Sequence, residues 1–313
     1  MSAVIQIEKL TKIYEGAARG QDVHALKDLD LTIDEGEILG YLGPNGSGKT
    51  TTIKMLLGLI FPTSGSISIF GQSDVDSPSV KRNIGYLPEG AYYPDFLKGE
   101  EVLRFYGRLY GMSGKKLEMR MDEVLELVGM THARKRLIRG YSKGMRQRIG
   151  LGQTLISDPK LMILDEPTTG LDPVARKEIR DLIVEMRSRG KTVMISSHEL
   201  LEVELISDRV GILYEGELQT LGMIGDLLTD RDLVIEASGA KDESVAKLGE
   251  HGITAEDRVD SRVRLRVPTD KDLYDAVELC KANSLEILNV SPRRETLEDL
   301  FVRIVGEAKA KRS

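Results

Sequence analysis

A glycine-rich octapeptide between an apolar run and a helical pattern constrains the fold of this chain most. The octapeptide Gly43-Pro-Asn-Gly-Ser-Gly-Lys49-Thr50 follows the apolar run Ile38 to Leu42 and precedes a helical pattern over Thr51 to Gly58. It matches G-x-x-x-x-G-K-[ST], in which glycines let backbone N–H groups surround phosphates and the helix N-terminus adds its dipole. Lys49 would reach the outer phosphates and Thr50 would ligate Mg²⁺. A glycine turn that binds nothing is the alternative, and the flanking strand and helix argue against it.

Composition limits the class of protein. The chain has 313 residues, enough for two domains, and its hydrophobic content of 41% with 30% charged residues indicates a folded globular protein. A formal net charge of -6 offers no overall attraction to nucleic acid or anionic lipid. The single cysteine, Cys280, has no partner for an internal disulfide, and we interpret it as a small core residue. No run approaches the roughly 18 apolar residues of a membrane span, and Met1 to Glu8 lacks a leader pattern, so we expect neither a bilayer span nor secretion.

Short apolar runs alternate with helical patterns over residues 1–225, which predicts an α/β domain with a largely parallel sheet. Within it, residues of about 95–155 carry helical periodicity instead, as in Val102, Phe105 and Leu109, and predict an inserted helical subdomain. The strands expected in this part are Ile38 to Leu42, Leu161 to Leu164, Thr192 to Ser196 and Val210 to Tyr214.

Residues 226–313 predict a small accessory α+β domain without a phosphate loop of its own. Its expected strands are Leu233 to Ala237, Val263 to Val267 and Ile287 to Val290, and its expected helices are Asp242 to Gly249, Asp270 to Asn283 and Thr296 to Val305.

A second motif supplies carboxylates. The apolar run Leu161 to Leu164 ends in Asp165 and Glu166, which places both acids at the carboxyl end of a buried strand, where open α/β sheets bind ligands. Asp165 would hold Mg²⁺ together with Thr50, and Glu166 would orient a water molecule and accept its proton. Two solvated acids at a strand end are the alternative, which the phosphate loop in the same chain disfavours.

Further segments point to one family. They are the signature segment, Tyr141 to Met145 (Tyr-Ser-Lys-Gly-Met), the interface loop, Thr169 to Asp172 (Thr-Gly-Leu-Asp), and Ser196-Ser197-His198-Glu199. In this order and spacing, residues 3–225 resemble the ATP-binding subunits of ABC transporters. The resemblance implies a P-loop NTPase core with an antiparallel β portion near the N-terminus and an inserted helical subdomain.

The resemblance also implies site residues, with ATP and Mg²⁺ as ligands. Glu166, His198 and Lys49 would be catalytic, and Thr50, Asp165 and Glu89 would lie at the metal. The nucleotide would be bound by Tyr14, Gly43, Pro44, Asn45, Gly46, Ser47, Gly48, Lys49, Thr50, Thr51, Glu89, Ser142, Gly144 and Asp172. His24, His132 and His251 lack such a context, and we expect them to be surface or packing residues.

Some of these roles keep an alternative. Tyr14 would stack on adenine, or it is a half-buried strand aromatic. Glu89 stands where relatives commonly carry glutamine, and a carboxylate cannot donate the hydrogen bonds of an amide, so a solvated loop acid is the alternative. In the signature segment, Lys143 stands where the family has a glycine, and Met145 stands where it has a glutamine. The ribose contact expected of that glutamine is therefore not expected of Met145.

One chain carries one phosphate loop and one signature segment, so the resemblance implies a second ATP-binding subunit paired head to tail, most simply a homodimer. It also implies a separate integral-membrane permease, which would hold the protein on the cytoplasmic face of the membrane. The permease would dock in a groove next to Tyr92, Tyr93, Pro94 and Phe96, and Asp95 to Gly111 would form most of the docking surface. The motif wording is similar to the drug, antibiotic and sodium exporter (ABC-2) branch, and no nucleic-acid partner is expected. The alternatives are a soluble ABC-type ATPase acting on ribosomes or nucleic acid, and a metabolic kinase, which would lack the signature segment and the interface loop.

Overall fold

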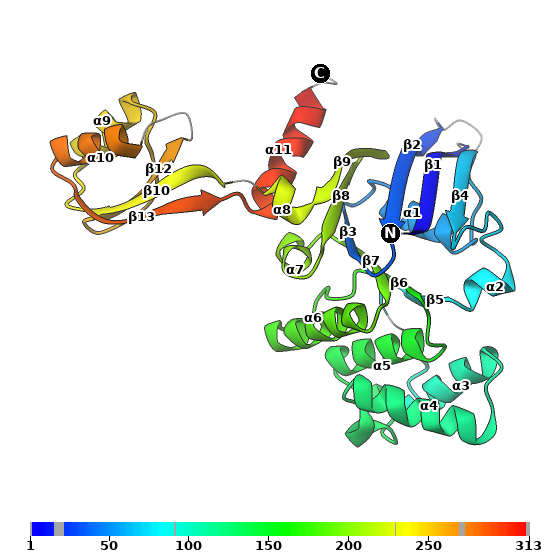
Figure 1. Cartoon of the computed structure of the whole chain (residues 1–313). Helices are drawn as coiled ribbons and strands as arrows, with labels where there is room; N and C mark the ends of the chain where they lie inside the picture. The colour runs from blue at the N-terminus through cyan, green and yellow to red at the C-terminus, as the bar shows by residue number, and fades with distance from the viewer. Residues whose placement is uncertain (1, 16–21, 91, 229, 269–272, 311–313) are drawn as a thin grey trace. The chain divides into compact units, whose positions relative to one another are not determined.

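The computed structural model describes residues 2–15, 22–90, 92–228, 230–268 and 273–310 (Figure 1). Its contacts divide the chain into two compact units, one of Met1–Ile224 with Phe301–Ser313 and one of Gly225–Leu300. The last helix, α11 (Leu297–Ala310), therefore begins in the second unit and continues in the first. In these described ranges, no helix has the length and apolar character needed to cross a bilayer.

A mixed six-stranded sheet forms the centre of the first unit. Its strand order is β5-β6-β7-β3-β8-β9, and the pairs are parallel from β5 through β8, whereas β9 pairs antiparallel with β8. The strands are β3 (Ile38–Leu42), β5 (Ile84–Leu87), β6 (Leu161–Asp165), β7 (Thr192–Ser197), β8 (Arg209–Tyr214) and β9 (Glu217–Met223). The four strands expected from the sequence are thus present, with bounds that differ by at most one residue.

Both faces of this sheet are covered. Along β6, Met162 and Leu164 belong to a core shared with the helical segments, while Leu161 and Ile163 belong to a core shared with the N-terminal strands. This alternation explains why the strand is a continuous apolar run, because a strand buried on both sides needs apolar residues at every position.

The N-terminal strands form a separate antiparallel sheet with the order β2-β1-β4. These strands are β1 (Ala3–Tyr14), β2 (Val23–Asp34) and β4 (Ser64–Ile69), and α1 (Lys49–Leu56) packs between this sheet and the central one. An antiparallel β portion near the N-terminus is therefore confirmed, together with the P-loop NTPase architecture.

The inserted helical segment is also present. It consists of α3 (Gly99–Leu109), α4 (Gly114–Leu127), the short 3₁₀ turns η1 (Thr131–Ala133) and η2 (Ile138–Gly140), and α5 (Lys143–Leu155). The remaining helices of the first unit are α2 (Pro78–Lys81), α6 (Pro173–Ser188) and α7 (Leu200–Glu204).

The second unit has a β-α-β-β-α-β order and one antiparallel sheet with the strand order β11-β12-β10-β13, which is the ferredoxin-like topology (Figure 1). Its elements are α8 (Ile224–Leu227) at the junction, β10 (Asp230–Ser238), α9 (Asp242–Glu250), β11 (Thr254–Val259), β12 (Arg262–Pro268), α10 (Leu273–Ala282) and β13 (Glu286–Arg294). The core is apolar and includes Cys280, as the sequence predicts. The helix expected from Asp270 begins at Leu273, and residues 269–272 lie outside the described part.

Candidate nucleotide-binding and hydrolysis site

Three neighbouring strands carry the candidate site. The phosphate loop follows β3, Asp165 and Glu166 end β6, and His198 follows β7; β6, β7 and β3 lie side by side in that order. Because they are parallel, their carboxyl ends meet at one edge of the sheet. A pocket of about 260 Å³ lies at this edge and is lined by Val23, His24, Ala25, Asn45, Gly46, Ser47, Gly48, Lys49, Thr50, Thr51, Glu89, Asp165, Glu166 and His198.

Two glycines of the loop are sterically required. A Cβ on Gly43 would lie 2.4 Å from both Leu213 O and Ser47 Oγ, and one on Gly48 would lie 2.5 Å from Ala25 O. Gly48 also has a φ of +111° and occupies the N-cap position of α1, where no side chain makes a capping hydrogen bond. Because glycine supplies no capping side chain, the first N–H groups of α1 remain available to an anion in the pocket.

Lys49 is buried at the base of the pocket. Its Nζ donates to Gly43 O at 2.6 Å and to Pro44 O at 3.3 Å, so the ammonium is held by the loop itself. Burial lowers the pKa of Lys49, and the carboxylates of Glu166, Asp165 and Glu89 oppose that shift. A cation held among three acids and a phosphate-binding loop has the charge to bridge a polyphosphate.

The loop also contains a buried polar atom without a protein partner. Ser47 Oγ has no hydrogen-bond partner within the described part of the chain, although Ser47 is buried. A buried hydroxyl without a partner is unfavourable unless a ligand or water supplies one. This hydroxyl and the uncapped N–H groups of α1 therefore fit a phosphate-bearing ligand.

The acids of β6 are held in different ways. Asp165 accepts a hydrogen bond from Ser196 Oγ at 2.5 Å; burial raises the pKa of Asp165 while this bond opposes the shift. Glu166 has a φ of +51°, so the extended conformation of β6 ends before this residue, and its backbone N–H donates to Ser196 O at 3.0 Å. A non-glycine residue in this conformation is uncommon and points to a functional position.

The Glu166 carboxylate has two side-chain partners. Its Oε2 lies 2.9 Å from His198 Nδ1 and accepts a hydrogen bond of 2.9 Å from Thr169 Oγ1. Thr169 has no predicted role of its own. The signal in the sequence is its position three residues after Glu166, a separation at which two side chains in a turn can make contact. His198 is half-exposed and lines the pocket, so the pair faces the space where a water molecule would lie.

The oxygen donors at the pocket fit magnesium. Thr50 and Asp165 line the pocket, and Glu89 lies on its wall as an exposed loop residue. Among the described residues there is no group of three or more His, Cys, Asp or Glu that would form a closed metal cage. Mg²⁺ is usually held by one or two protein oxygens, with water and phosphate oxygens supplying the rest, so this donor set is appropriate.

The wall opposite the acids comes from the start of β2. Val23, His24 and Ala25 line the pocket, so His24 lies at the site, although no motif in the sequence points to it. Tyr14 lies opposite Val23 in the β1–β2 pairing, with Lys12 Nζ 5.3 Å from the centre of its ring. Tyr14 is exposed and next to the pocket wall, but it is not among the described lining residues, so stacking on adenine stays a prediction.

Among the described residues, neither the signature segment nor the interface loop lines this pocket, although Thr169 of the interface loop contacts Glu166, which does. Ser142 caps α5 by accepting a hydrogen bond of 3.2 Å from Met145 N, and Asp172 caps α6 by accepting one of 2.9 Å from Ala175 N. A Cβ on Gly144 would lie 3.1 Å from Ala175 Cβ, so the starts of these two helices are in contact. Within the described part, Ser142, Gly144 and Asp172 are absent from the pocket lining of their own chain.

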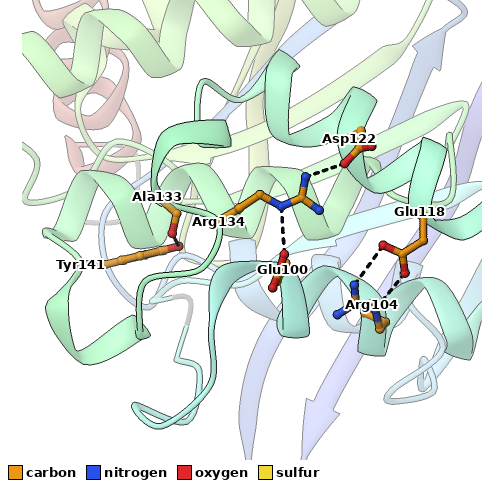
Figure 2. A network of polar contacts seen from close by, with 7 residues as sticks. All are labelled: Glu100, Arg104, Glu118, Asp122, Ala133, Arg134 and Tyr141. Atoms are coloured by element: carbon orange, nitrogen blue, oxygen red, sulfur yellow. Dashed lines mark hydrogen bonds and ion pairs between the residues drawn. The ribbon is translucent and has the colours of Figure 1, made fainter.

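Polar contacts within the helical segment hold the signature segment in place (Figure 2). Tyr141 donates through its hydroxyl to Ala133 O at 2.8 Å. Arg134, next to that carbonyl, pairs with Glu100 of α3 at 2.9 Å and with Asp122 of α4 at 2.6 Å, and Arg104 forms a two-pronged contact with Glu118. The Tyr141 hydrogen bond therefore joins the start of the signature segment to the turn η1 of the helical segment.

The aromatic residues before α3 differ from one another. Tyr92 and Phe96 are 92% and 75% exposed, whereas Tyr93 is packed against the core and donates its hydroxyl to Gln153 Oε1 at 3.0 Å. Tyr93 is thus a packing residue rather than an exposed aromatic. Tyr92 and Tyr93 both line a second pocket of about 470 Å³, which also includes Leu57, Tyr86, Tyr106 and Tyr110.

Comparison with known proteins matches residues 26–169 to the family described as ABC transporter. The bacitracin transport ATP-binding protein BcrA of Bacillus licheniformis is 36% identical over 98% of this chain and 98% of its own length. The daunorubicin resistance ATP-binding protein DrrA3 of Streptomyces coeruleorubidus is 33% identical over 91% of this chain and 92% of its own length.

Two solved structures are similar to a large part of this chain. An ATP-binding subunit of an ABC transporter is 31% identical, with a TM-score of 0.62 over 72% of this chain and 91% of that one. The ATP-binding cassette MJ0796, described as a dimeric post-hydrolysis state bound to ADP and Pi, is 25% identical with a TM-score of 0.63 over 70% of this chain and 98% of that one. The chain therefore belongs to the ATP-binding proteins of ABC transporters, and it is an ATPase.

Proposed function

We propose that two copies of this chain bind MgATP between them and that hydrolysis drives export through a separate integral-membrane permease. The observation that carries the proposal is the single pocket that brings together the phosphate loop, Asp165, Glu166 and His198. Relatives over the whole length include proteins named for bacitracin transport and daunorubicin resistance, which supports a role in export.

Each residue then has a task in the hydrolysis of ATP by water. The N–H groups of the loop and Lys49 bind the β- and γ-phosphates, and Thr50 and Asp165 hold Mg²⁺, which supplies charge neutralisation on the phosphate oxygens. Glu166 accepts a proton from the attacking water as the new Pγ–O bond forms and the bond to the β-phosphate oxygen breaks. His198 and Thr169 fix the Glu166 carboxylate, because both contact the same oxygen, Oε2.

The second copy supplies what one pocket lacks. Ser142 and the start of α5 lie away from the pocket of their own chain, so they are available to the γ-phosphate bound by the partner. The dipole of α5 favours an anion at that end. ATP then joins the two copies, and loss of the γ-phosphate releases them, which is a ligand-driven two-state switch.

The experiment uses Glu166→Gln, which keeps the shape of the side chain and removes the proton acceptor. We expect the variant to bind MgATP and to hydrolyse it on the order of 10²–10⁴ times more slowly than the parental protein. With MgATP bound the variant should remain dimeric, and with ADP it should be monomeric. Light scattering with size-exclusion chromatography measures the dimer, and phosphate release measures hydrolysis. Parental hydrolysis by the variant would contradict the role of Glu166, and a monomer under all nucleotide conditions would contradict the dimer.

For the membrane partner, we propose the groove next to Tyr92 and Phe96 as the docking surface, since two large exposed aromatics beside an apolar pocket are typical of interfaces. Tyr92→Ser with Phe96→Ser should move the protein from the membrane fraction of its host to the soluble fraction. Tyr274→Ser, which alters an exposed aromatic of the second unit, is the control. Co-sedimentation with ribosomes in place of membranes would favour a soluble ABC-type ATPase.

A further inference from the structure

The interface loop contacts Glu166 directly through Thr169, and one arginine of α6 also joins this loop to the segment that follows His198. The interface loop, Thr169 to Asp172, leads directly into α6, and His198 lies one residue before Glu199, the N-cap position of α7. Arg176, in the first turns of α6, contacts both of these segments.

The contacts of Arg176 are specific. Its Nε donates to Leu171 O, in the interface loop, at 2.9 Å, and its Nη2 lies 3.2 Å from Glu199 Oε1. The two side chains are 33% and 17% exposed, so the pair is only partly screened by water. A planar guanidinium can hold a carbonyl and a carboxylate at once in fixed directions, which a lysine cannot do.

Glu199 is in turn fixed to the strand that ends at His198. Its backbone N–H donates to Ser197 Oγ at 2.9 Å, and Ser197 is a buried residue at the end of β7 that lies beside Leu42 of β3. Movement of Glu199 is therefore transmitted to the peptide that carries His198, whose ring lies 2.9 Å from Glu166. A continuous set of contacts thus runs from Leu171 through Arg176 and Glu199 to the His198–Glu166 pair.

The carboxylate of Glu199 is not fully used. Its Oε2 is buried without a hydrogen-bond partner in the described part of the chain, although Oε1 is paired with Arg176. A buried carboxylate oxygen without a donor is unfavourable, so Oε2 retains the capacity to accept a further hydrogen bond. The arrangement therefore offers Arg176 more than one way to engage the same acid.

We propose that Arg176 is a positioning residue that couples the interface loop to His198 and, through it, to Glu166. The inference rests on the proposed function, in which the start of α5 meets the partner's nucleotide, and the interface loop lies beside that helix end because Gly144 of α5 and Ala175 of α6 approach each other closely. Occupancy of one ATP site then changes the position of Leu171, and Arg176 and Glu199 carry that change to the water-activating pair of the same chain.

The next turn of α6 provides a matched control. Arg180 pairs with Glu202 of α7 at 2.9 Å, and these side chains are 18% and 12% exposed. Arg180 joins the same two helices with the same type of ion pair, but its described contacts do not include the interface loop. A merely structural role for Arg176 therefore predicts that Arg176→Gln and Arg180→Gln behave alike.

The experiment compares the two variants in the full-length protein. We expect both to lower the Tm by a similar amount, while only Arg176→Gln lowers kcat, on the order of tenfold to a hundredfold, because a misplaced His198 no longer fixes Glu166. KM for ATP stays at the parental value, because Arg176 is not among the residues lining the pocket. The Hill coefficient for ATP hydrolysis falls, since one link from the interface loop to the His198–Glu166 pair is lost while the bond of Thr169 to Glu166 remains.

Two further variants separate position from folding. Arg176→Lys keeps the charge beside Glu199 and hence the Tm, but it should not restore kcat, because a lysine ammonium lacks the planar, fixed N–H directions with which the guanidinium holds Leu171 O and Glu199 together. Arg176→Gln and Glu199→Gln should be non-additive in kcat when combined, as expected for residues in one chain of contacts.

Several results would overturn the inference. These are parental kcat and Hill coefficient in Arg176→Gln, equal kinetic losses in Arg176→Gln and Arg180→Gln, and full activity in Arg176→Lys. A parental chain that neither hydrolyses MgATP nor forms a dimer as Glu166→Gln would instead overturn the proposed function, and the inference with it.

Discussion

The two units of the molecule bury different kinds of side chain. In the first unit, many of the buried polar residues gather at the carboxyl edge of the central sheet: Ser47, Lys49, Thr52, Asp165, Glu166, Thr168, Ser196 and Ser197. In the second unit, the core formed by β10, β12, α9 and α10 is apolar. Among the residues of this unit that the structure describes, Glu295, near its end, is the buried polar one.

This difference separates stability from ligand binding. Burial of polar groups is costly, and proteins accept that cost where the groups have partners or bind ligands. The first unit therefore shows its function in its interior, whereas the core of the second unit, in the part that the structure describes, is apolar. BcrA and DrrA3 nevertheless match over nearly the whole chain, so the second unit belongs to the architecture that these relatives share.

The largest expected change in the free energy of unfolding concerns the second unit, and it tests whether this unit contributes stability without contributing to ATP binding. Leu265 is fully buried in its apolar core, and Leu265→Ala should destabilise that unit by about 2–5 kcal/mol, through lost transfer energy and a cavity. Hydrogen exchange should report the loss within residues 230–300, while ATP affinity at the phosphate loop remains unchanged. Leu288→Ala, at an exposed position, is the control, and a loss of ATP affinity in Leu265→Ala would show that the two units are not independent.

The opposite result is expected at Lys49. Lys49→Ala removes a charged donor to phosphate, which is worth about 1.5–3 kcal/mol, or about a tenfold to a hundredfold in the Kd for ATP. Its effect on the free energy of unfolding should stay within about 1 kcal/mol, because the burial that lowers the pKa of Lys49 also makes its charged form costly. Lys54→Ala, at an exposed position of the same helix, should change neither quantity. Unchanged affinity in Lys49→Ala, measured by calorimetry, would mean that the loop is not the phosphate site.

Much of the first unit could be predicted from the sequence because its strands are short, apolar and parallel. The octapeptide after β3, the acids after β6 and His198 after β7 need only the rule that carboxyl ends share an edge. The strand order then places them in one pocket, and the structure has that order.

The missed features depend on non-local contacts or exposed positions. Val23 and His24 reach the pocket through the β1–β2 pairing, whose register shifts several times and has no local sequence signal. β11 was not anticipated because all six of its residues are exposed, so it lacks the alternation that identifies a half-buried strand. The sequence cannot show that Tyr93 is packed and Tyr92 exposed, because both are tyrosines in the same loop. The difference arises from packing against the helical segment, where Tyr93 bonds Gln153 of α5.

A smaller effect sharpens the comparison at Ser142. Ser142→Ala removes an N-cap and should cost about 1 kcal/mol of stability. Ser77→Ala removes another serine N-cap, at α2, and serves as the matched control. Only Ser142→Ala should also weaken the ATP-dependent dimer of the Glu166→Gln variant, as measured by sedimentation. Equal dimerisation of the two double variants would leave Ser142 as a helix cap alone.

An effect on stability alone, of about the same size as at Ser142, is expected at Tyr141, whose hydroxyl fixes the signature segment to the 3₁₀ turn at Ala133 (Figure 2). Tyr141→Phe keeps the ring and removes one buried hydrogen bond, which should cost about 0.5–1.5 kcal/mol in urea unfolding of the first unit. Tyr92→Phe, at an exposed hydroxyl, should cost nothing measurable. Because the neighbouring ion pairs of Arg134 and Arg104 involve partly exposed side chains, each contributes little by itself. A zero effect of Tyr141→Phe would therefore assign the position of the signature segment to apolar packing, as in the second unit, and would remove part of the contrast between the two units.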